Sequence, residues 1–173
     1  SGKQSAWRLG NNIINALIVI TGLLVVLGIV FATPLVTAFA GDYAAVPGKL
    51  ELTILLTRIM LPFLTFVALA AAVMGMLNAL HQFFIPALSP AMFNVATIVC
   101  ALTLVPVMSR LGLPPIAAIA IGTLVGGVAQ LALQWPILRR QGFSYRPTLD
   151  WGDAGLRRVL TLMGPGTLGL AAT

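Results

Sequence analysis

Apolar residues fill four long stretches of this chain, and polar residues collect in the short segments between them. The stretches cover residues 13–39, 52–79, 91–108 and 116–138, and Arg58 is the one charged residue inside them. The hydrocarbon core of a bilayer is about 30 Å thick and takes about 20 helical residues to cross. The stretches are continuous and lack the alternation of barrel strands, so each predicts a transmembrane helix. The pattern therefore predicts an all-α integral membrane protein.

The C-terminal part of the chain has a different pattern. Asp150 is placed to cap a helix, and Asp153 lies three residues later, which approximates a capping box. Five apolar side chains then share one helical face: Trp151, Leu156, Val159, Leu160 and Met163. This pattern predicts an interfacial helix that leads into a truncated membrane helix, over residues 151–173. Since the apolar run continues to Thr173 and the chain does not start with methionine, we expect an internal piece of a larger protein, with residues 1–173 as a single membrane domain.

The composition agrees with a membrane protein and changes the meaning of the net charge. Charged residues make up 8% of the chain and hydrophobic residues 59%. Soluble domains have about 25% and 45–50%. A formal net charge of +6 in a soluble protein would suggest a nucleic-acid partner. The basic residues instead cluster in particular loops, so we expect membrane contacts and no nucleic acid.

The basic residues divide unevenly between the two sides of the predicted helices. With four crossings, both end segments and the second loop share one side, which holds seven Lys and Arg residues. The other side holds Lys49 and Arg110. The positive-inside rule then predicts that both ends are cytoplasmic. Four arginines on that side are predicted to contact lipid head groups: Arg139, Arg140, Arg157 and Arg158.

Prolines and small residues predict where helices begin, bend and pack. Ser89-Pro90 is typical of an N-cap followed by proline at the first helical position, and predicts the start of the third helix. Pro62 is expected to bend the second helix. Gly122 and Gly126 form a GxxxG motif, which we expect to pack helices within the bundle rather than to form a dimer.

Side chains suited to catalysis are few. The chain has one histidine, one cysteine (Cys100) and four acidic residues. His81 and Ser89 are a conceivable dyad, but nothing orients the imidazole, and a loop histidine at a helix end is the favoured interpretation. Asn78 and Asn94 are expected to form interhelical hydrogen bonds or to cap helices, and substrate contact is the alternative. No metal-ligand spacing and no glycine-rich phosphate loop occurs, so we expect no metal, no cofactor and no catalytic group.

Arg58 is the remaining candidate for a binding residue. An arginine at the centre of a bilayer costs about 2.5–3.5 kcal/mol on insertion scales, and such residues usually face a partner or a cavity. On one interpretation Arg58 helps to bind an anionic substrate. On the other, which we favour, its side chain reaches the head groups from about 9 Å below the outer end of its helix. Asp42 and Glu51 are candidate partners.

The segment between the second and third predicted helices resembles a known family. Residues 78–98 read NALHQFFIPALSPAMFNVATI and closely resemble the signature region of MurJ (MviN-type) lipid II flippases. Three further segments are similar to that family in the right order: LTRIMLPF at 56–63, GGVAQLALQWPILRRQGF at 126–143 and DAGLRRVLTLMGPGTLG at 153–169. The resemblance extends over almost the whole chain.

The resemblance implies a fourteen-helix transporter of the multidrug/oligosaccharidyl-lipid/polysaccharide exporter superfamily. This chain would be helices three to six and the start of seven, within the N-lobe. The implied activity is alternating-access transport of lipid II, the undecaprenyl-pyrophosphate-linked peptidoglycan precursor, from the inner to the outer leaflet of the bacterial cytoplasmic membrane. The implied partners are this precursor, membrane lipids and the missing helices of the same protein. A related polysaccharide or oligosaccharide exporter is the alternative, and a membrane enzyme or structural subunit is less favoured.

The resemblance assigns few residue roles. The family's substrate-binding arginines lie chiefly on its first, second and eighth helices, so no arginine here takes that role by motif. Arg58 falls on a helix that mainly packs the N-lobe, which weakens its case as a substrate ligand. Gly164 and Pro165 fall at the start of the implied seventh helix. Because proline frees a backbone carbonyl and glycine permits bending, we expect a hinge there.

Overall fold

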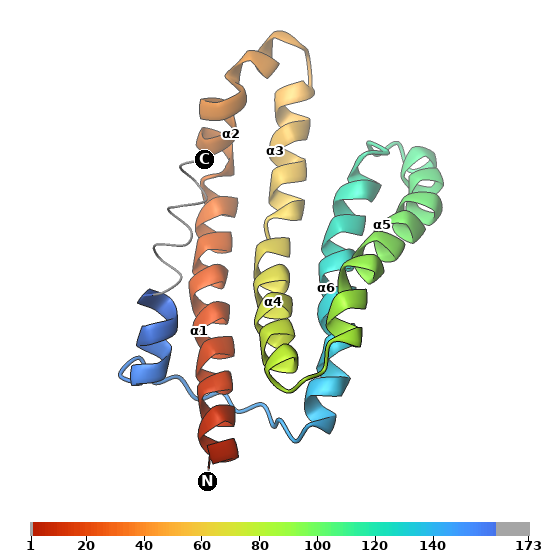
Figure 1. The fold of residues 1–173 in the computed structure, drawn as a ribbon. Coiled ribbons are helices and arrows are strands. Elements are labelled where there is room, and N and C mark those ends of the chain that lie inside the picture. The colour runs from red at the N-terminus through yellow and green to blue at the C-terminus, as the bar shows by residue number, and fades with distance from the viewer. Residues whose placement is uncertain (1, 162–173) are drawn as a thin grey trace.

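The computed structural model describes residues 2–161, which form helices joined by short turns (Figure 1). Its elements in chain order are α1 Gly2–Val30, α2 Ala32–Ala40, the short 3₁₀ helix η1 Gly41–Ala45, α3 Lys49–Met60, α4 Phe63–Ala79, α5 Phe84–Arg110 and α6 Ala117–Arg140. A further helical segment covers residues 154–161. Four spans are long and apolar enough to cross a membrane: Gly2–Val30, Lys49–Ala79, Phe84–Arg110 and Ala117–Arg140. The predicted all-α class and its four spans are confirmed.

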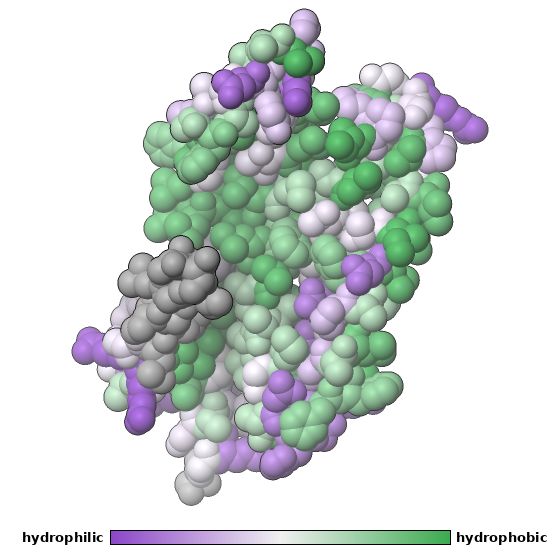
Figure 2. Space-filling view, turned by 45° about the horizontal axis from the view of Figure 1, so that its top comes forward, coloured by the Kyte–Doolittle hydropathy of each residue, from purple (hydrophilic) through white to green (hydrophobic). Residues whose placement is uncertain are grey.

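The spans pack as two antiparallel hairpins. The rod formed by α1 and α2 runs beside α3 and α4, and α5 runs beside α6 (Figure 1). The hairpins meet where α4 packs against α6. Figure 2 shows hydrophilic residues gathered toward the two ends and mostly hydrophobic residues between them. Many large apolar side chains between the ends are exposed in this chain, as lipid-facing or helix-facing surfaces are.

Two of the four apolar stretches are interrupted by proline. The first predicted helix is broken at Phe31, three residues before Pro34, so it forms α1 and α2. The second is broken at Leu61 and Pro62, which separates α3 from α4 and confirms the predicted bend. The α3/α4 break lies against α1 at a glycine, since a Cβ built on Gly28 would come within 3.0 Å of the Leu61 side chain.

Two helices begin earlier than the apolar pattern predicts. α1 starts at Gly2 instead of residue 13, because polar residues that the hydropathy pattern excluded are also helical. α5 starts at Phe84 instead of residue 91, so the predicted N-cap and first turn at Ser89-Pro90 are wrong. Pro86 occupies the first turn of α5, where its missing N–H costs little. Ser89 is fully buried and bonds to α6.

α6 is packed closely because its glycines accept neighbouring aromatic rings. A Cβ at Gly126 would lie 2.6 Å from the Phe93 ring of α5, and one at Gly127 would lie 2.7 Å from the Phe63 ring of α4. At Gly122 a Cβ would lie 3.1 Å from the side chain of Cys100 on α5. The predicted use of the GxxxG motif for packing within the bundle is confirmed.

The turn between α4 and α5 shows the structural role of His81. His81 has a left-handed backbone with φ of 58°, the conformation that ends many helices. The N–H of His81 donates to the Asn78 carbonyl at 3.0 Å, and the N–H of Gln82 donates to the Leu77 carbonyl at 2.9 Å. These bonds satisfy the last carbonyls of α4. His81 is therefore an exposed helix-terminating residue, as expected.

Candidate functional site

The most elaborate polar structure lies where the segment after α6 crosses α1. Residues 143–150 have no regular secondary structure, and they run past the N-terminal end of α1 toward the helical segment 154–161 (Figure 1). An extended strand without a sheet leaves its backbone groups without partners. Here α1 supplies those partners from asparagine side chains on two adjacent helical turns. We call residues 143–150 the connector.

Asn11 and Asn15 bind the connector backbone. The Asn11 amide donates to the Ser144 carbonyl at 3.0 Å, and its oxygen accepts from the Arg146 N–H at 2.7 Å. The Asn15 amide donates to the carbonyls of Arg146 and Thr148, both at 2.8 Å. The Asn15 oxygen also accepts from the Tyr145 hydroxyl at 2.7 Å. These contacts join residues about 130 positions apart in the sequence.

Asp150 does not cap a helix, so the predicted capping box is wrong. Its carboxylate accepts from the Gly152 N–H at 2.9 Å and forms an ion pair with Arg8 at 3.2 Å. Asp153 is the cap instead, because its carboxylate accepts from the Leu156 N–H at 3.0 Å, three residues into the helix. The cap moves because the ion pair with α1 and the turn at Gly152 occupy Asp150.

Aromatic rings surround the start of the connector. Phe143 is buried and packs edge-on against Trp7 and Trp135, with ring centroids 5.4 and 5.9 Å apart. Trp135 also contacts Tyr145 at 6.3 Å. Trp135 and Tyr145 thus help to hold the connector against α1 and α6.

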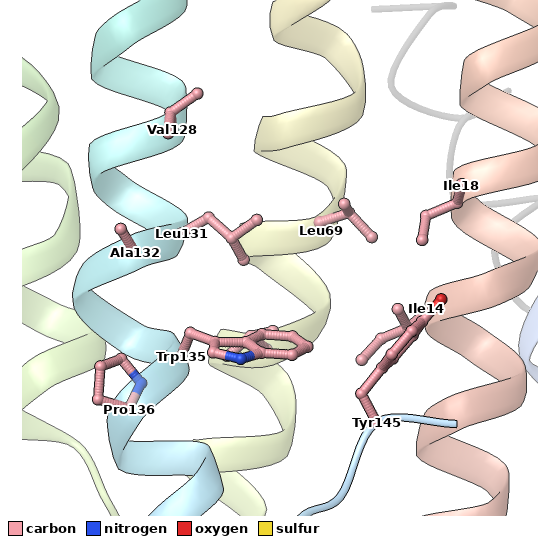
Figure 3. A pocket seen from close by; sticks show the side chains of 10 residues that line it. Ile14, Ile18, Leu69, Val128, Leu131, Ala132, Trp135, Pro136 and Tyr145 are labelled. Atoms are coloured by element: carbon pink, nitrogen blue, oxygen red, sulfur yellow. The ribbon is translucent and has the colours of Figure 1, made fainter. Parts of the chain in front are cut away.

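An apolar pocket of about 440 Å³ opens above these rings, between α1, α4 and α6 (Figure 3). Trp135 and Tyr145 lie at one end, and aliphatic side chains such as Ile18, Leu69 and Leu131 form the walls. The Tyr145 hydroxyl is already bonded to Asn15. The pocket therefore offers mainly contact surface for an apolar group.

A buried polar pair joins α5 to α6. The Gln134 amide donates to the Ser89 hydroxyl at 2.8 Å, and that hydroxyl donates to the Gln130 carbonyl at 3.1 Å. Ser89 is thus engaged with α6, and His81 is exposed beside Phe83. The disfavoured His81–Ser89 dyad is not formed. Within residues 2–161, no group of three or more His, Cys, Asp or Glu side chains lies close enough to hold a metal ion.

Arg58 lies in the last turn of α3, one turn before the proline break. Its side chain is exposed and donates to the Thr33 hydroxyl at 3.4 Å. In the described part of the chain the one ion pair joins Arg8 to Asp150, so Arg58 pairs with neither Asp42 nor Glu51. The structure does not bring Arg58 together with any other polar candidate.

The remaining predicted residues divide into two groups. Gly164 and Pro165, the expected hinge, lie outside the described residues. The basic residues at the end of α6 and in the helical segment 154–161 are exposed: Arg139, Arg140, Arg157 and Arg158. Arg157 also donates to the Trp151 carbonyl at 3.0 Å.

Sequence reasoning missed the asparagines that matter. Asn78 and Asn94, expected to bridge or cap helices, are exposed, and their side chains form none of the expected hydrogen bonds within residues 2–161. Asn11, Asn12 and Asn15 are buried instead. The available signal was their spacing, since positions 11 and 15 share one helix face next to the first apolar stretch.

Comparisons with known proteins identify the family. A family model described as "Lipid II flippase MurJ" matches residues 1–173. A Buchnera aphidicola subsp. Acyrthosiphon pisum protein named "Probable lipid II flippase MurJ" is 33% identical over 150 residues, which cover 87% of this chain and 29% of that protein. A Bdellovibrio bacteriovorus protein of the same name is 35% identical over 171 residues, covering 95% of this chain and 31% of that protein.

A third relative supports the same family assignment. The Burkholderia cenocepacia protein named "Lipid II flippase MurJ" is 31% identical over 150 residues, covering 84% of this chain and 28% of that protein. The chain thus spans less than a third of the length of the curated relatives it matches. The family match covers the whole chain and includes the segment between α4 and α5 that carries the resemblance. This chain belongs to the lipid II flippase MurJ family.

Proposed function

We propose that this chain is part of a flippase that moves lipid II, the undecaprenyl-pyrophosphate-linked peptidoglycan precursor, from the inner to the outer leaflet of the bacterial cytoplasmic membrane. The observation that carries the proposal is the family match over all 173 residues. Four membrane-crossing helices packed through glycines suit a rigid part of a transporter lobe. The chain acts as a transporter segment, by alternating access, together with the helices that complete the longer protein.

Both ends of the chain are proposed to face the cytoplasm. The N-terminal end of α1, the C-terminal end of α6 and the connector lie at the same end of the bundle (Figure 1). That end carries seven of the ten Lys and Arg residues, whereas Lys49 and Arg110 lie at the other. The positive-inside rule supports this orientation. The exposed side chains of Arg139, Arg140, Arg157 and Arg158 are proposed to contact lipid head groups there.

The flippase proposal is tested by depleting the full-length protein in the bacterium that encodes it, in a strain without a redundant flippase. Lipid II exposed on the outer leaflet is measured by its cleavage with an enzyme added outside the cells. We expect exposure to collapse while the total precursor pool rises, and the complementing gene to restore both. Unchanged exposure of lipid II with loss of a surface polysaccharide would instead identify a polysaccharide exporter.

Arg58 is proposed to serve the membrane interface rather than the substrate. It is exposed, it donates to one threonine hydroxyl at 3.4 Å, and no carboxylate of residues 2–161 pairs with it. We expect Arg58→Leu in the full-length protein to leave the transport rate within about twofold, because snorkelling cations are replaceable. The measurement is outer-leaflet lipid II in cells with equal protein levels. A loss greater than about tenfold would assign Arg58 to substrate binding instead.

A further inference from the structure

A second pocket lies at the basic end of the bundle, between α1 and the connector. Its volume is about 620 Å³, and it is separate from the apolar pocket of Figure 3. The α1 wall includes Arg8 and Asn12, and the connector wall includes Arg146, Thr148 and Asp150. Residues from sequence positions more than 130 apart therefore form one polar cavity.

Asn12 lines this pocket with an incomplete set of hydrogen bonds. It is 1% exposed, and its oxygen accepts from the Asp150 N–H at 3.2 Å. The opposite amide orientation would set two donors against each other, so this contact fixes the direction of the side chain. The amide nitrogen of Asn12 then has no hydrogen-bond partner among the described residues. A buried N–H group without an acceptor costs free energy. The Asn12 amide therefore favours a bound group that brings an acceptor into the pocket.

The charges around the pocket select the kind of acceptor. Arg8 and Arg146 bring two positive charges, and Asp150 offsets one of them through its ion pair with Arg8. The Arg146 guanidinium has no partner within residues 2–161, although its backbone is held by Asn11 and Asn15. A guanidinium without a partner that lines the same pocket as a buried amide donor suits an oxyanion with several acceptor oxygens.

We propose that this pocket binds a phosphate group, with Asn12 and Arg146 as its donors and Arg8 as the second cation. The pocket lies at the end of the bundle where the arginines gather, which is the depth of lipid head groups. The source of the phosphate is the head group of an anionic membrane lipid. The site does not depend on the flippase proposal, since it needs only these residues and a membrane surface.

The test measures binding to the full-length protein purified in a neutral detergent, with dihexanoyl phosphatidylglycerol as the probe. A diacylglycerol with the same acyl chains controls for apolar contact, and inorganic phosphate is added as a competitor. We expect saturable binding of the phosphatidylglycerol alone. Arg146→Gln should weaken it about tenfold or more, because a charge-assisted hydrogen bond is lost while the backbone contacts of the residue remain.

Lys3→Gln is the matched control, since it removes one exposed positive charge from the same end without lining the pocket. It should change the affinity less than about twofold, because a charge that does not line the pocket acts on the phosphate only through screening solvent. The proposed site is refuted if Lys3→Gln and Arg146→Gln weaken phosphatidylglycerol binding equally, or if the diacylglycerol binds equally well. If millimolar phosphate competes with the lipid, the site is confirmed and its ligand is a free phosphate compound. If phosphate does not compete, the ligand is the lipid head group. No saturable binding of either probe refutes the proposal.

Discussion

Replacing Gly126 with alanine is expected to destabilise the full-length protein by about 1–3 kcal/mol, because the added methyl overpacks a site that has no room. A Cβ there would lie 2.6 Å from the Phe93 ring and 3.0 Å from the Phe93 carbonyl oxygen. The backbone oxygen cannot rotate away, so relief requires α5 to move. The measurement is the free energy of unfolding in a membrane-mimetic system, for instance by steric trapping.

The destabilisation by Gly126→Ala should also affect the packing of α4. The rings of Phe93 and Phe63 lie 5.5 Å apart and meet over Gly126 and Gly127 of α6. α4 and α5 contact each other little, so α6 is the common support for both hairpins. A shift of α5 away from α6 therefore removes a neighbour of Phe63 as well, and weakens the contact between the two hairpins.

A double-mutant cycle separates this steric effect from a general loss of helix quality. Phe93→Ala removes the ring that the new methyl meets, so the double variant should lose less stability than the sum of the single variants. Gly75→Ala is the matched control on α4, where a Cβ meets nothing within 4 Å in this structure, and it should be neutral or slightly stabilising. Strict additivity of Gly126→Ala and Phe93→Ala would contradict the packing explanation.

The sequence was sufficient for this part of the fold because membrane helices are specified locally. Each span is recognisable from its own apolar residues, and Pro62 marks its break wherever the helix packs. Gly122 and Gly126 show that a close partner exists, although the pattern does not name the helix it belongs to. The structure adds that the partner is α5, and that the neighbouring Gly127 receives a ring from α4.

The roles of the polar residues could not be predicted from local sequence, because these roles depend on distant parts of the chain. Ser89 has the local pattern of an N-cap, yet its hydroxyl bonds to α6, more than 40 positions away. Asn11 looked like a polar residue before the first membrane helix, yet it is buried inside α1 under the connector. Hydropathy ends a predicted helix at such residues, whereas tertiary hydrogen bonds let the helix continue through them.

Contacts with distant residues also explain why Asp150 was wrongly predicted to cap the helix. Both Asp150 and Asp153 are of a residue type that caps helices, and the local pattern favours Asp150. Arg8 decides between them, because the ion pair holds Asp150 on α1 and leaves Asp153 as the free carboxylate at the helix start. No local pattern places Arg8 beside residue 150.

Replacing both Asn11 and Asn15 with alanine is expected to release the connector from α1. Together their side chains accept the Arg146 N–H and the Tyr145 hydroxyl, and donate to three carbonyls of the connector. Each asparagine is worth about 1–3 kcal/mol, because its removal leaves part-buried backbone groups without partners. Hydrogen exchange of the Arg146 amide, which Asn11 protects, should accelerate about tenfold or more in the double variant.

Asn78→Ala is the matched control, since Asn78 is an asparagine at the same end of the bundle whose side chain forms no hydrogen bond within residues 2–161. It should leave exchange across residues 144–150 unchanged. Asn11→Ala alone should expose the Arg146 amide, whereas Asn15→Ala should loosen the segment without removing that acceptor. Slow exchange at Arg146 in the double variant would show that Phe143 and the surrounding aromatic rings hold the connector without the asparagines. Fast exchange would show that these two side chains fix where the chain leaves α6 and turns toward its next helix.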